Sequence, residues 1–391
     1  MPPAAPLATI RCPSRQHQVR LDPSRWWAPA SCPVCKVPVD PFRLVRGVRW
    51  LGGRAPVGVV RAGPLALAPA ELIGWLAFAG VVLVALLMRW WGDRNMVGTL
   101  LLWSGRWVWL LPLAALAPLG LVAWRALLPL ALAAVVVVGW VMGASTGWRA
   151  RLGAPEGLRV RVVSYNVAGG VAVAGTLRAL VDELRPDILA IQECGPALVP
   201  VLKALPGYAI DTGDLCLATR FPVQASAIMP AEQYKGISYA AARRYTLATP
   251  AGPVAFTNIH LETPRRGLQV LLTGDLGAAR VAVEKNLEFR SLQARQARRW
   301  VDSTTAPRLA AGDFNMPVES AIWRATWRGL SDAWDAAGTG FGYTKRDGWI
   351  RSRIDHVLFD ARWRAVHAEV ARDFGSDHRP MVADVVLVAA P

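Results

Sequence analysis

Two polar residues follow an apolar run in the segment AAGDFNMP, from Ala310 to Pro317. Asp313 and Asn315 stand two positions apart, and alternation along an extended chain would turn both side chains to one face. Gly312 would let the backbone pass close to a neighbour. A carboxylate and a carboxamide aimed at one point suit a phosphate group beside a hard metal ion. The same residues also suit an ordinary turn, so the rest of the chain has to decide.

Other polar residues follow or interrupt apolar runs elsewhere in the chain. Polar groups at the edge of an apolar core are unfavourable unless they bind one another or a ligand. Their Asn, Glu and Asp oxygens are ligands that Mg²⁺ or Mn²⁺ prefers, whereas a zinc site would use Cys or several His. Two histidines among carboxylates can divide acid–base and charge-stabilising work near neutral pH. In order, these residues are Asn166, Glu193, His260, Asp355, Asp377 and His378.

Such residues need a scaffold that brings strand ends together. From Gly157 onward the composition is that of an α/β domain, long enough for a large core. Residues 177–184 predict a short amphipathic helix and 281–301 a long one with a solvated arginine face. His356 is interpreted as strand packing. Val, Ile and Tyr content predicts strands over residues 159–167, 187–192, 215–219, 245–248, 254–261, 307–311, 354–359 and 381–388.

The N-terminal half is far more apolar than a soluble domain requires. The chain has 391 residues, of which 53% are hydrophobic. Three apolar stretches, 71–88, 107–124 and 126–143, each approach the roughly 20 residues that cross a bilayer. Tryptophans flank them as in interfacial belts, and their prolines are tolerated in membrane helices. We therefore predict three transmembrane helices within residues 67–148 rather than buried helices of a soluble protein.

The formal net charge of +16 is unevenly distributed. Residues 1–150 carry 15 Lys and Arg against 4 Asp and Glu, and residues 151–391 carry 29 against 24. Most of the excess therefore lies beside the predicted membrane segments, where arginine is expected near lipid headgroups. It argues only weakly for a nucleic-acid groove.

The first 41 residues concentrate cysteines in a short polar segment. Cys32 and Cys35 have zinc-knuckle spacing and resemble the N-terminal zinc ribbons of bacterial proteins. The other pair is broken, because Arg15 stands where the partner of Cys12 would be. We predict a degenerate zinc-ribbon-like segment that could hold Zn²⁺ through Cys12, His17, Cys32 and Cys35, or else a decayed ribbon without metal. Residues 42–66 predict a basic linker.

Membrane orientation is not decided by the flanking charges. With the N-terminus in the cytoplasm, more of the flanking arginines lie outside than the positive-inside rule favours. A thiol zinc site, however, is safest in a reducing cytosol, and three spans would then place the C-terminal domain outside. We predict a multi-pass cell-membrane protein with an extracytoplasmic catalytic domain.

The motifs YN, QE, HLE, GDFN, RIDHVL and SDHRP occur in this order across residues 157–388. In this they resemble the endonuclease/exonuclease/phosphatase (DNase I-like) superfamily. The resemblance implies a four-layer α/β/β/α sandwich and metal-dependent hydrolysis of phosphoric esters. By position, it implies metal binding by Asn166, Glu193 and Asp377, and catalytic roles for His260, Asp313, Asn315, Asp355 and His378.

The resemblance also implies individual roles. His378 would be the general base or its equivalent, oriented by Asp355, and Asp313 would position the attacking water. Asn315 and His260 would hold the phosphoryl oxygens as charge builds. Arg220, in LATRFPV, matches the family's usual Ser-Arg step, although Thr219 replaces the serine. Arg265 and Arg266 suit a second phosphate, a lipid headgroup or a nucleic-acid backbone, and the predicted substrate-binding residues are Arg220, Arg265 and Arg266.

Three membrane spans before such a domain resemble the membrane phosphatases of the teicoplanin-resistance VanJ type, which implies a polyprenyl pyrophosphate substrate. We predict a membrane-anchored, Mg²⁺-dependent phosphoesterase that acts on a lipid-linked phosphate or pyrophosphate. The alternatives are a membrane-tethered endonuclease or exonuclease, a sphingomyelinase-like phosphodiesterase, and a non-catalytic membrane adaptor. Nucleic acid is a possible partner that is not favoured.

Overall fold

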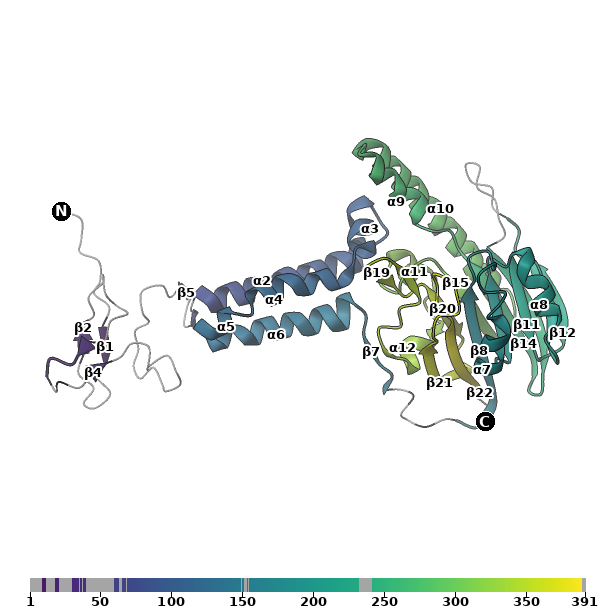
Figure 1. Ribbon diagram of the computed structural model, residues 1–391, viewed down its shortest axis with the longest axis horizontal. Helices are drawn as coiled ribbons and strands as arrows, with labels where there is room; N and C mark the ends of the chain where they lie inside the picture. Colours follow the sequence, from purple (N-terminus) through teal and green to yellow (C-terminus); the bar gives the residue numbers. More distant parts are fainter. Residues whose placement is uncertain are drawn as a thin grey trace. The chain divides into compact units, whose positions relative to one another are not determined.

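The computed structural model describes residues 9–11, 18–20, 30–34, 36, 38–39, 60–62, 65–67, 69–148, 150, 153, 155–231 and 241–388. By contact the chain divides into two compact units, Met1–Ala79 with Leu113–Leu132, and Gly80–Pro112 with Ala133–Pro391. The second unit therefore contains the whole α/β domain together with the adjoining parts of the apolar helices (Figure 1).

Near the N-terminus the structure describes three short antiparallel strand pairs. They are β1 (Thr9–Arg11) with β2 (Gln18–Arg20), β3 (Ala30–Ser31) with β4 (Pro38–Val39), and β5 (Val60–Ala62) with β6 (Leu65–Leu67). Cys32 is buried. Cys12, His17 and Cys35 lie outside the described residues, so zinc binding stays a prediction.

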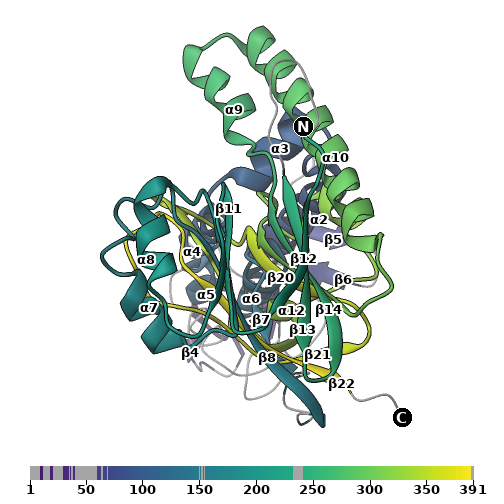
Figure 2. The same cartoon turned by 90° about the vertical axis from the view of Figure 1, so that its right-hand side faces the viewer.

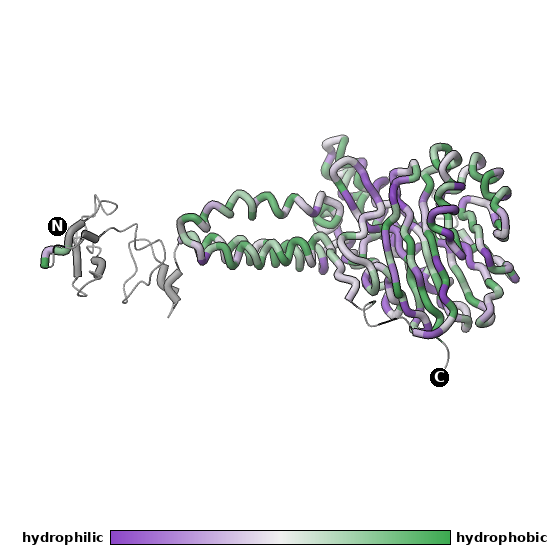
Figure 3. The backbone as a smooth tube through the Cα atoms, turned by 60° about the horizontal axis from the view of Figure 1, so that its bottom comes forward, coloured by the Kyte–Doolittle hydropathy of each residue, from purple (hydrophilic) through white to green (hydrophobic). Residues whose placement is uncertain are grey.

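Two helical stretches are long and apolar enough to cross a membrane. One is α2 (Pro69–Trp91), and the other is the run Trp124–Val141, made of η2 (Trp124–Ala126), α6 (Leu127–Val136) and the π-helical η3 (Val137–Val141). Figure 3 shows their largely hydrophobic colouring. The predicted first and third spans thus coincide with continuous helices.

The predicted second span is more complicated. Helix α3 (Met96–Trp103) is bent by 89° from the run Arg106–Leu121, which includes η1 (Arg106–Trp109), α4 (Leu110–Leu116) and the start of α5 (Leu119–Val122). The described residues hold two such helices, or three if the bent pair counts as one span. Three crossings therefore stay a prediction, and α3 is an element that the sequence analysis did not include.

The α/β domain is built on two mixed six-stranded sheets. The first has the order β10 (Ala209–Asp211), β11 (Leu215–Thr219), β9 (Ile188–Gln192), β8 (Gly157–Asn166), β22 (Met381–Val388) and β21 (Trp363–Val370). The second has the order β12 (Val223–Ile228), β13 (Ala242–Thr249), β14 (Gly252–His260), β15 (Arg308–Asp313), β20 (Asp355–Phe359) and β16 (Ser331–Asp332).

Apolar side chains of both sheets form a common core between them, with Val162 and Ile188 from the first sheet and Phe256 and Leu309 from the second. Helices α7 (Leu177–Leu184) and α8 (Val199–Lys203) cover the outer face of the first sheet. Helices α10 (Leu276–Asp302) and α11 (Ala321–Thr326) cover the outer face of the second sheet. Figure 2 shows α7 and α8 on one side of the sheets and α10 on the other. The order of layers is helix, sheet, sheet, helix.

Each sheet contains one parallel pair that matters for the site. β8 runs parallel to β9, and β14 runs parallel to β15. β20 runs antiparallel to β15, so that its first residue lies beside the last residue of β15. The carboxyl ends of four strands and the start of a fifth therefore meet at one edge of the two-sheet stack.

Candidate active site

The catalytic cluster, defined here as Asn166, Glu193, His260, Asp313, Asp355 and His378, lies at that edge. Asn166 ends β8, Glu193 directly follows β9, and His260 ends β14. Asp313 ends β15, where it is the register partner of both His260 and Asp355. The expected strand ends therefore converge.

Asp313 is the centre of the cluster. Its Oδ2 accepts a hydrogen bond from Asn166 Nδ2 at 3.0 Å, and Oδ1 accepts one from the Asn315 backbone N–H at 2.8 Å. The Nδ2 group of Asn166 also donates to Glu193 Oε1 at 3.0 Å, which joins the two sheets through one amide. Gly312 lets β15 lie this close to β14. Its φ is 154°, and a Cβ at this position would lie 1.8 Å from the Ile259 carbonyl oxygen.

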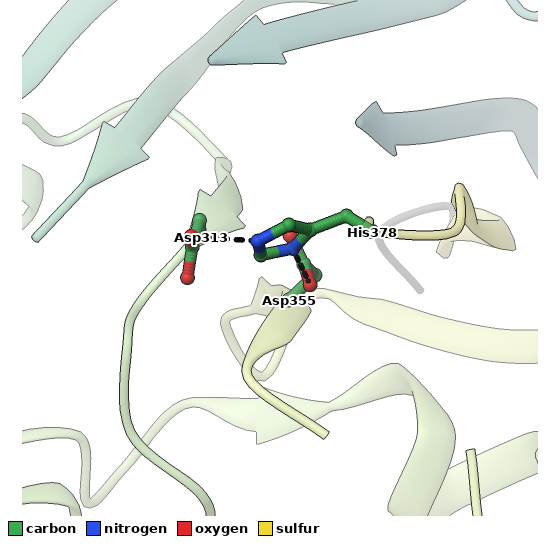
Figure 4. A group of neighbouring side chains, drawn as sticks. All are labelled: Asp313, Asp355 and His378. Atoms are coloured by element: carbon green, nitrogen blue, oxygen red, sulfur yellow. Dashed lines mark hydrogen bonds and ion pairs between the residues drawn. The ribbon is translucent and has the colours of Figure 1, made fainter. Parts of the chain in front are cut away.

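His378 lies between two buried carboxylates (Figure 4). Its Nδ1 is 2.8 Å from Asp355 Oδ2, and its Nε2 is 3.7 Å from Asp313 Oδ2. The loop that carries it is held by Ser376 Oγ, which donates to the Asn166 carbonyl at 2.8 Å. Asp355 can therefore fix the ring of His378 with one nitrogen facing Asp313.

His260 and Asn315 border the same space. His260 Nε2 is 3.6 Å from Glu193 Oε1 and 3.9 Å from Asp313 Oδ2. Asn315 has a φ of 48° and donates from Nδ2 to the Leu261 carbonyl at 2.8 Å. Glu193 also has a positive φ, 53°, and such non-glycine residues are uncommon away from turns and functional sites.

The pKa values of two cluster residues are shifted by their surroundings. Burial raises the pKa of Asp313, and the neighbouring Asp355 carboxylate raises it further. Burial alone would lower the pKa of His378, but the Asp355 and Asp313 carboxylates outweigh it and raise that pKa. The surroundings therefore favour the protonated forms of Asp313 and His378.

Asp377, predicted to bind metal, is paired with a lysine. Its carboxylate is 47% exposed and forms an ion pair with Lys345, in β18 (Lys345–Asp347). Partial burial would raise the pKa of Asp377, but Lys345 lowers it, with help from His378 and Arg265. Metal binding by Asp377 stays a prediction, and Lys345 is a residue near the site that sequence reasoning did not include.

The predicted substrate-binding arginines have two different placements. Arg265 and Arg266 are exposed in α9 (Arg265–Leu268), directly beyond the end of β14, and Arg266 Nε lies 3.5 Å from Glu262 Oε1. Arg220 follows Thr219, the last residue of β11. Thr219 is the register partner of Ile188, at the start of β9. Because Glu193 is at the other end of β9, Arg220 lies away from the catalytic cluster, and its assignment to substrate binding stays a prediction.

Arg220 has local partners at its own end of the sheet. Its guanidinium lies over the ring of Tyr208, with Nε 3.3 Å from the hydroxyl oxygen.

The interpretation of His356 as a packing residue is confirmed. It is fully buried, with Nδ1 2.7 Å from Asp332 Oδ2 and Nε2 3.1 Å from the Met316 carbonyl oxygen. Both ring nitrogens are thus occupied on the side of β20 away from the catalytic cluster.

The donor set fits a divalent cation. Glu193 reaches solvent, with 44% of its side chain exposed, and Asp355 Oδ1 is buried without a hydrogen-bond partner among the described residues. Ligand atoms of Asp313, Asp355 and His378 lie within 4.8 Å of one another. Mg²⁺ commonly takes one or two carboxylates and leaves the other positions to water and phosphate oxygens. The oxygen-rich cluster suits that chemistry, and the identity of the metal stays a prediction.

A disulfide bond involves the residue next to Glu193. Cys194 follows Glu193 and is bonded to Cys216 of β11. Sequence reasoning considered only the N-terminal cysteines. The sequence signal for this bond was that Cys194 follows one predicted strand and Cys216 belongs to another. Their pairing could be seen only from the β9–β11 register, in which Cys216 is opposite Ile191.

Residues 163–378 match the model of the Endonuclease/Exonuclease/phosphatase family. No curated protein matches the chain.

Several solved structures are similar. One is Danio rerio TDP2 complexed with a single-strand DNA product, at 18% identity, covering 58% of this chain and 98% of that chain with a TM-score of 0.45. Another is the human Nocturnin catalytic domain with a bound sulfate, at 17% identity, 61% and 99% coverage and a TM-score of 0.44. A third is a Bacteroides thetaiotaomicron protein of the same named family, at 18% identity, 60% and 97% coverage and a TM-score of 0.44.

The family match spans more than half of the chain and includes every residue of the catalytic cluster from Asn166 to His378. The chain therefore belongs to the endonuclease/exonuclease/phosphatase family and is a metal-dependent phosphoric ester hydrolase.

Proposed function

We propose that this protein is a membrane-anchored, Mg²⁺-dependent phosphoesterase that hydrolyses a lipid-linked phosphate or pyrophosphate. The cluster supports the hydrolytic chemistry, since all six of its polar residues meet at one edge. The membrane and lipid parts of the proposal depend on how the apolar helices join this domain.

The observation that carries those parts is the position of Arg290. This side chain of α10 is fully buried, and its two terminal nitrogens lie 3.0 and 3.1 Å from the carboxylate of Asp93, just beyond α2. The same guanidinium donates to the Asn315 carbonyl at 2.9 Å. One side chain thus links the end of an apolar helix to the GDFN loop. If α2 crosses a membrane, the active site is held next to its surface.

The connection that follows His260 supports an amphiphilic substrate. Arg265 and Arg266 are exposed in α9, and η6 (Gln269–Thr273) and the start of α10 then expose Leu272 by 88% and Leu276 by 66%. Cationic and apolar groups on one hairpin suit a ligand with a phosphate and a hydrocarbon chain.

The reaction can be written on residues of this chain. In neutral His378, Nδ1–H donates a hydrogen bond to Asp355, which leaves Nε2 free to take a proton from a water that Asp313 positions. The water oxygen bonds to phosphorus as the bond from phosphorus to the leaving oxygen breaks, and the protonated His378 can return the proton to that leaving oxygen. His260 and the second amide N–H of Asn315 stabilise charge on the phosphoryl oxygens. Mg²⁺ bound at Asn166 and Glu193, with Asp377 as the further predicted ligand, would neutralise phosphate charge and act as a Lewis acid.

We place the catalytic domain outside the cytoplasm. Structural disulfides persist in oxidising compartments and are rare in the cytosol. The Cys194–Cys216 bond belongs to the core of the catalytic domain, behind Glu193, which supports the predicted extracytoplasmic location.

The test is phosphate release from a polyprenyl pyrophosphate by full-length protein purified in detergent with Mg²⁺. Asp313→Ala and His378→Ala should each lower the rate by about 10²- to 10⁴-fold, as for loss of a positioned proton-transfer group. Asp182→Asn, an exposed carboxylate on α7, is the matched control and should keep full activity.

A DNA-nicking assay run in parallel separates the alternatives. Release lost in both variants, with DNA left intact, supports the lipid phosphatase. Metal-dependent nicking without phosphate release would instead make the protein a tethered nuclease. Failure of both reactions would leave the non-catalytic adaptor.

A further inference from the structure

A cavity separate from the catalytic cluster lies beside the edge strand β21. It has a volume of about 490 Å³, and none of its lining residues belongs to the cluster. Three arginines line it, Arg346, Arg351 and Arg379. We refer to it as the arginine pocket.

The three guanidinium groups have no carboxylate partner within the part of the chain that the structure describes. Arg379 Nε is buried and lacks a hydrogen-bond partner among those residues. Like charges gathered in one cavity are unfavourable unless an anion joins them, and guanidinium groups match phosphate geometry well.

The other charged groups do not cancel this excess. Glu369 is the carboxylate that lines the pocket, and it lies 3.5 Å from His367 Nε2, which lines the pocket too. Burial lowers the pKa of Arg346, and the nearby Arg379 and Arg351 lower it further, whereas Asp373 opposes them. The arginines therefore repel one another in a space large enough for a ligand.

The pocket walls are fixed by backbone hydrogen bonds. Arg346 N–H donates to the Asp377 carbonyl at 3.1 Å, and Arg379 N–H donates to the Thr344 carbonyl at 2.7 Å. Two arginines from different segments are thereby held on neighbouring backbones. The backbone positions of Arg346 and Arg379 are therefore fixed before a ligand binds.

The pocket also has an aromatic side, and one of its two aromatic residues is hydrogen-bonded to the end of an apolar helix. Phe341 and Tyr343 both line it, with rings stacked at 5.3 Å and an interplanar angle of 8°. The Tyr343 hydroxyl donates to the carbonyl of Met142, directly after η3, at 3.2 Å. Nearby, Trp107 Nε1 donates to the Trp349 carbonyl at 3.2 Å. Tyrosine and tryptophan at helix ends are typical of a membrane interface.

We propose that the arginine pocket binds the phosphate group of an anionic lipid headgroup, as a site distinct from the catalytic cluster. The arginines would hold the phosphate, and the aromatic pair would contact the less polar glycerol part. The lipid source rests on the membrane anchoring proposed above. Phosphate binding itself does not, because free phosphate would satisfy the same arginines.

Calorimetric titration of the full-length protein in detergent tests this site. The protein carries Asp313→Asn and EDTA is present, so turnover and metal-dependent binding at the catalytic cluster are both suppressed. Three probes are used: dihexanoyl phosphatidylglycerol, dihexanoyl phosphatidylcholine and inorganic phosphate. We expect phosphatidylglycerol to bind more tightly than phosphatidylcholine.

Arg346→Ala with Arg351→Ala should weaken that binding by roughly tenfold or more, since two charge-assisted contacts are lost. Arg295→Ala with Arg299→Ala removes the same charge from exposed positions of α10 and should leave it unchanged. The single Arg351→Ala variant should weaken binding by less, and the unfolding midpoint of all variants is measured alongside.

The outcomes separate the two proposals. Inorganic phosphate that binds as tightly as phosphatidylglycerol, and is lost in the Arg346 and Arg351 double variant, would keep the phosphate site and remove its lipid source. No binding of either ligand, or binding that the double variant retains while folded, would overturn the site. Because an inactive protein is titrated, failure of the proposed hydrolysis would not change these readings.

Discussion

At the scale of single residues, the site buries more negative charge than its hydrogen bonds satisfy. Asp313 and Asp355 are register partners with almost no exposure, and Asp355 Oδ1 has no hydrogen-bond partner among the described residues. Burying charges in this way costs folding free energy unless a ligand compensates. The arrangement is therefore better explained by catalysis than by stability.

Asp355→Asn should affect catalysis and folding stability differently. The rate of phosphoester hydrolysis should fall by about 10²- to 10⁴-fold, because His378 loses the carboxylate that orients it. The free energy of unfolding should change by less than about 1 kcal/mol or increase, because one of two adjacent buried carboxylates is removed. Steady-state kinetics and thermal unfolding measure both quantities on the same preparation.

Asp332→Asn is the matched control for that variant. Asp332 also pairs with a buried histidine, His356 at 2.7 Å, and its carboxylate binds Arg353 at 3.3 Å. This change should lower the free energy of unfolding by roughly 3 kcal/mol, as for a broken buried ion pair, and leave the activity of the folded protein intact. Equal activity losses in both variants would contradict the assignment of Asp355 to catalysis and His356 to packing.

At the scale of elements, the catalytic domain and the ends of the apolar helices form one packed unit. Asp93 accepts hydrogen bonds from Arg290 and, at 3.2 Å, from Trp103 Nε1, while Arg106 Nη1 lies 3.0 Å from Glu319 Oε2. These contacts join helix ends to α10 and to the loop after GDFN. The helical segment is therefore more than a flexible tether in this structure.

The Asp93–Arg290 pair gives this view a quantitative test. Asp93→Asn should lower the free energy of unfolding by about 3–5 kcal/mol, because Arg290 stays buried without a charged partner. Asp93→Leu combined with Arg290→Met should recover most of that loss. Thermal unfolding and limited proteolysis in detergent provide the measurement.

The exposed Arg178–Asp182 pair of α7 is the control for this pair. Its side chains are 57% and 61% exposed, so Asp182→Asn should cost less than about 0.5 kcal/mol. If Asp93→Asn were equally mild, the helix ends would contribute little to the unit, and the proposed role of Arg290 in holding the active site near a membrane would be wrong.

At the scale of the whole molecule, compartment and topology are linked by the disulfide. Cys194 and Cys216 close a loop with a sequence separation of 22 residues. Such a cross-link is worth roughly 3 kcal/mol in an oxidising compartment and would not form in a reducing one. If the chain spans a membrane as proposed, its topology therefore determines whether this cross-link forms and stabilises the catalytic domain.

Fusion of reporters after Val388 tests the topology. Alkaline phosphatase, which is active only outside the cytoplasm, should be active in this position, and green fluorescent protein exported through the general secretory pathway should stay dark. Protein taken from the same cells and denatured should react with maleimide at Cys194 and Cys216 only after reduction. Fluorescent fusions together with two freely reactive thiols would place the domain in the cytoplasm.

Much of the fold follows from local sequence signals. The helix over 177–184 was predicted with its observed bounds, and strands 215–219 and 381–388 likewise agree. Short edge strands such as β10 and β16 were not predicted, because two or three residues carry too little pattern to distinguish a strand from a loop. Helix α11, which is six residues long, was missed for the same reason.

By itself the sequence determined which residues end strands and what chemistry they offer, because apolar runs and the polar residues that end them are local properties. Asn166, Glu193, His260, Asp313 and Asp355 were identified in this way, and the structure brings them together. The tertiary structure decided the placement of Arg220 at the opposite sheet end, the Asp377–Lys345 pair, the disulfide and the Asp93–Arg290 contact. Those features depend on strand register and on packing between distant segments, and a local pattern contains neither.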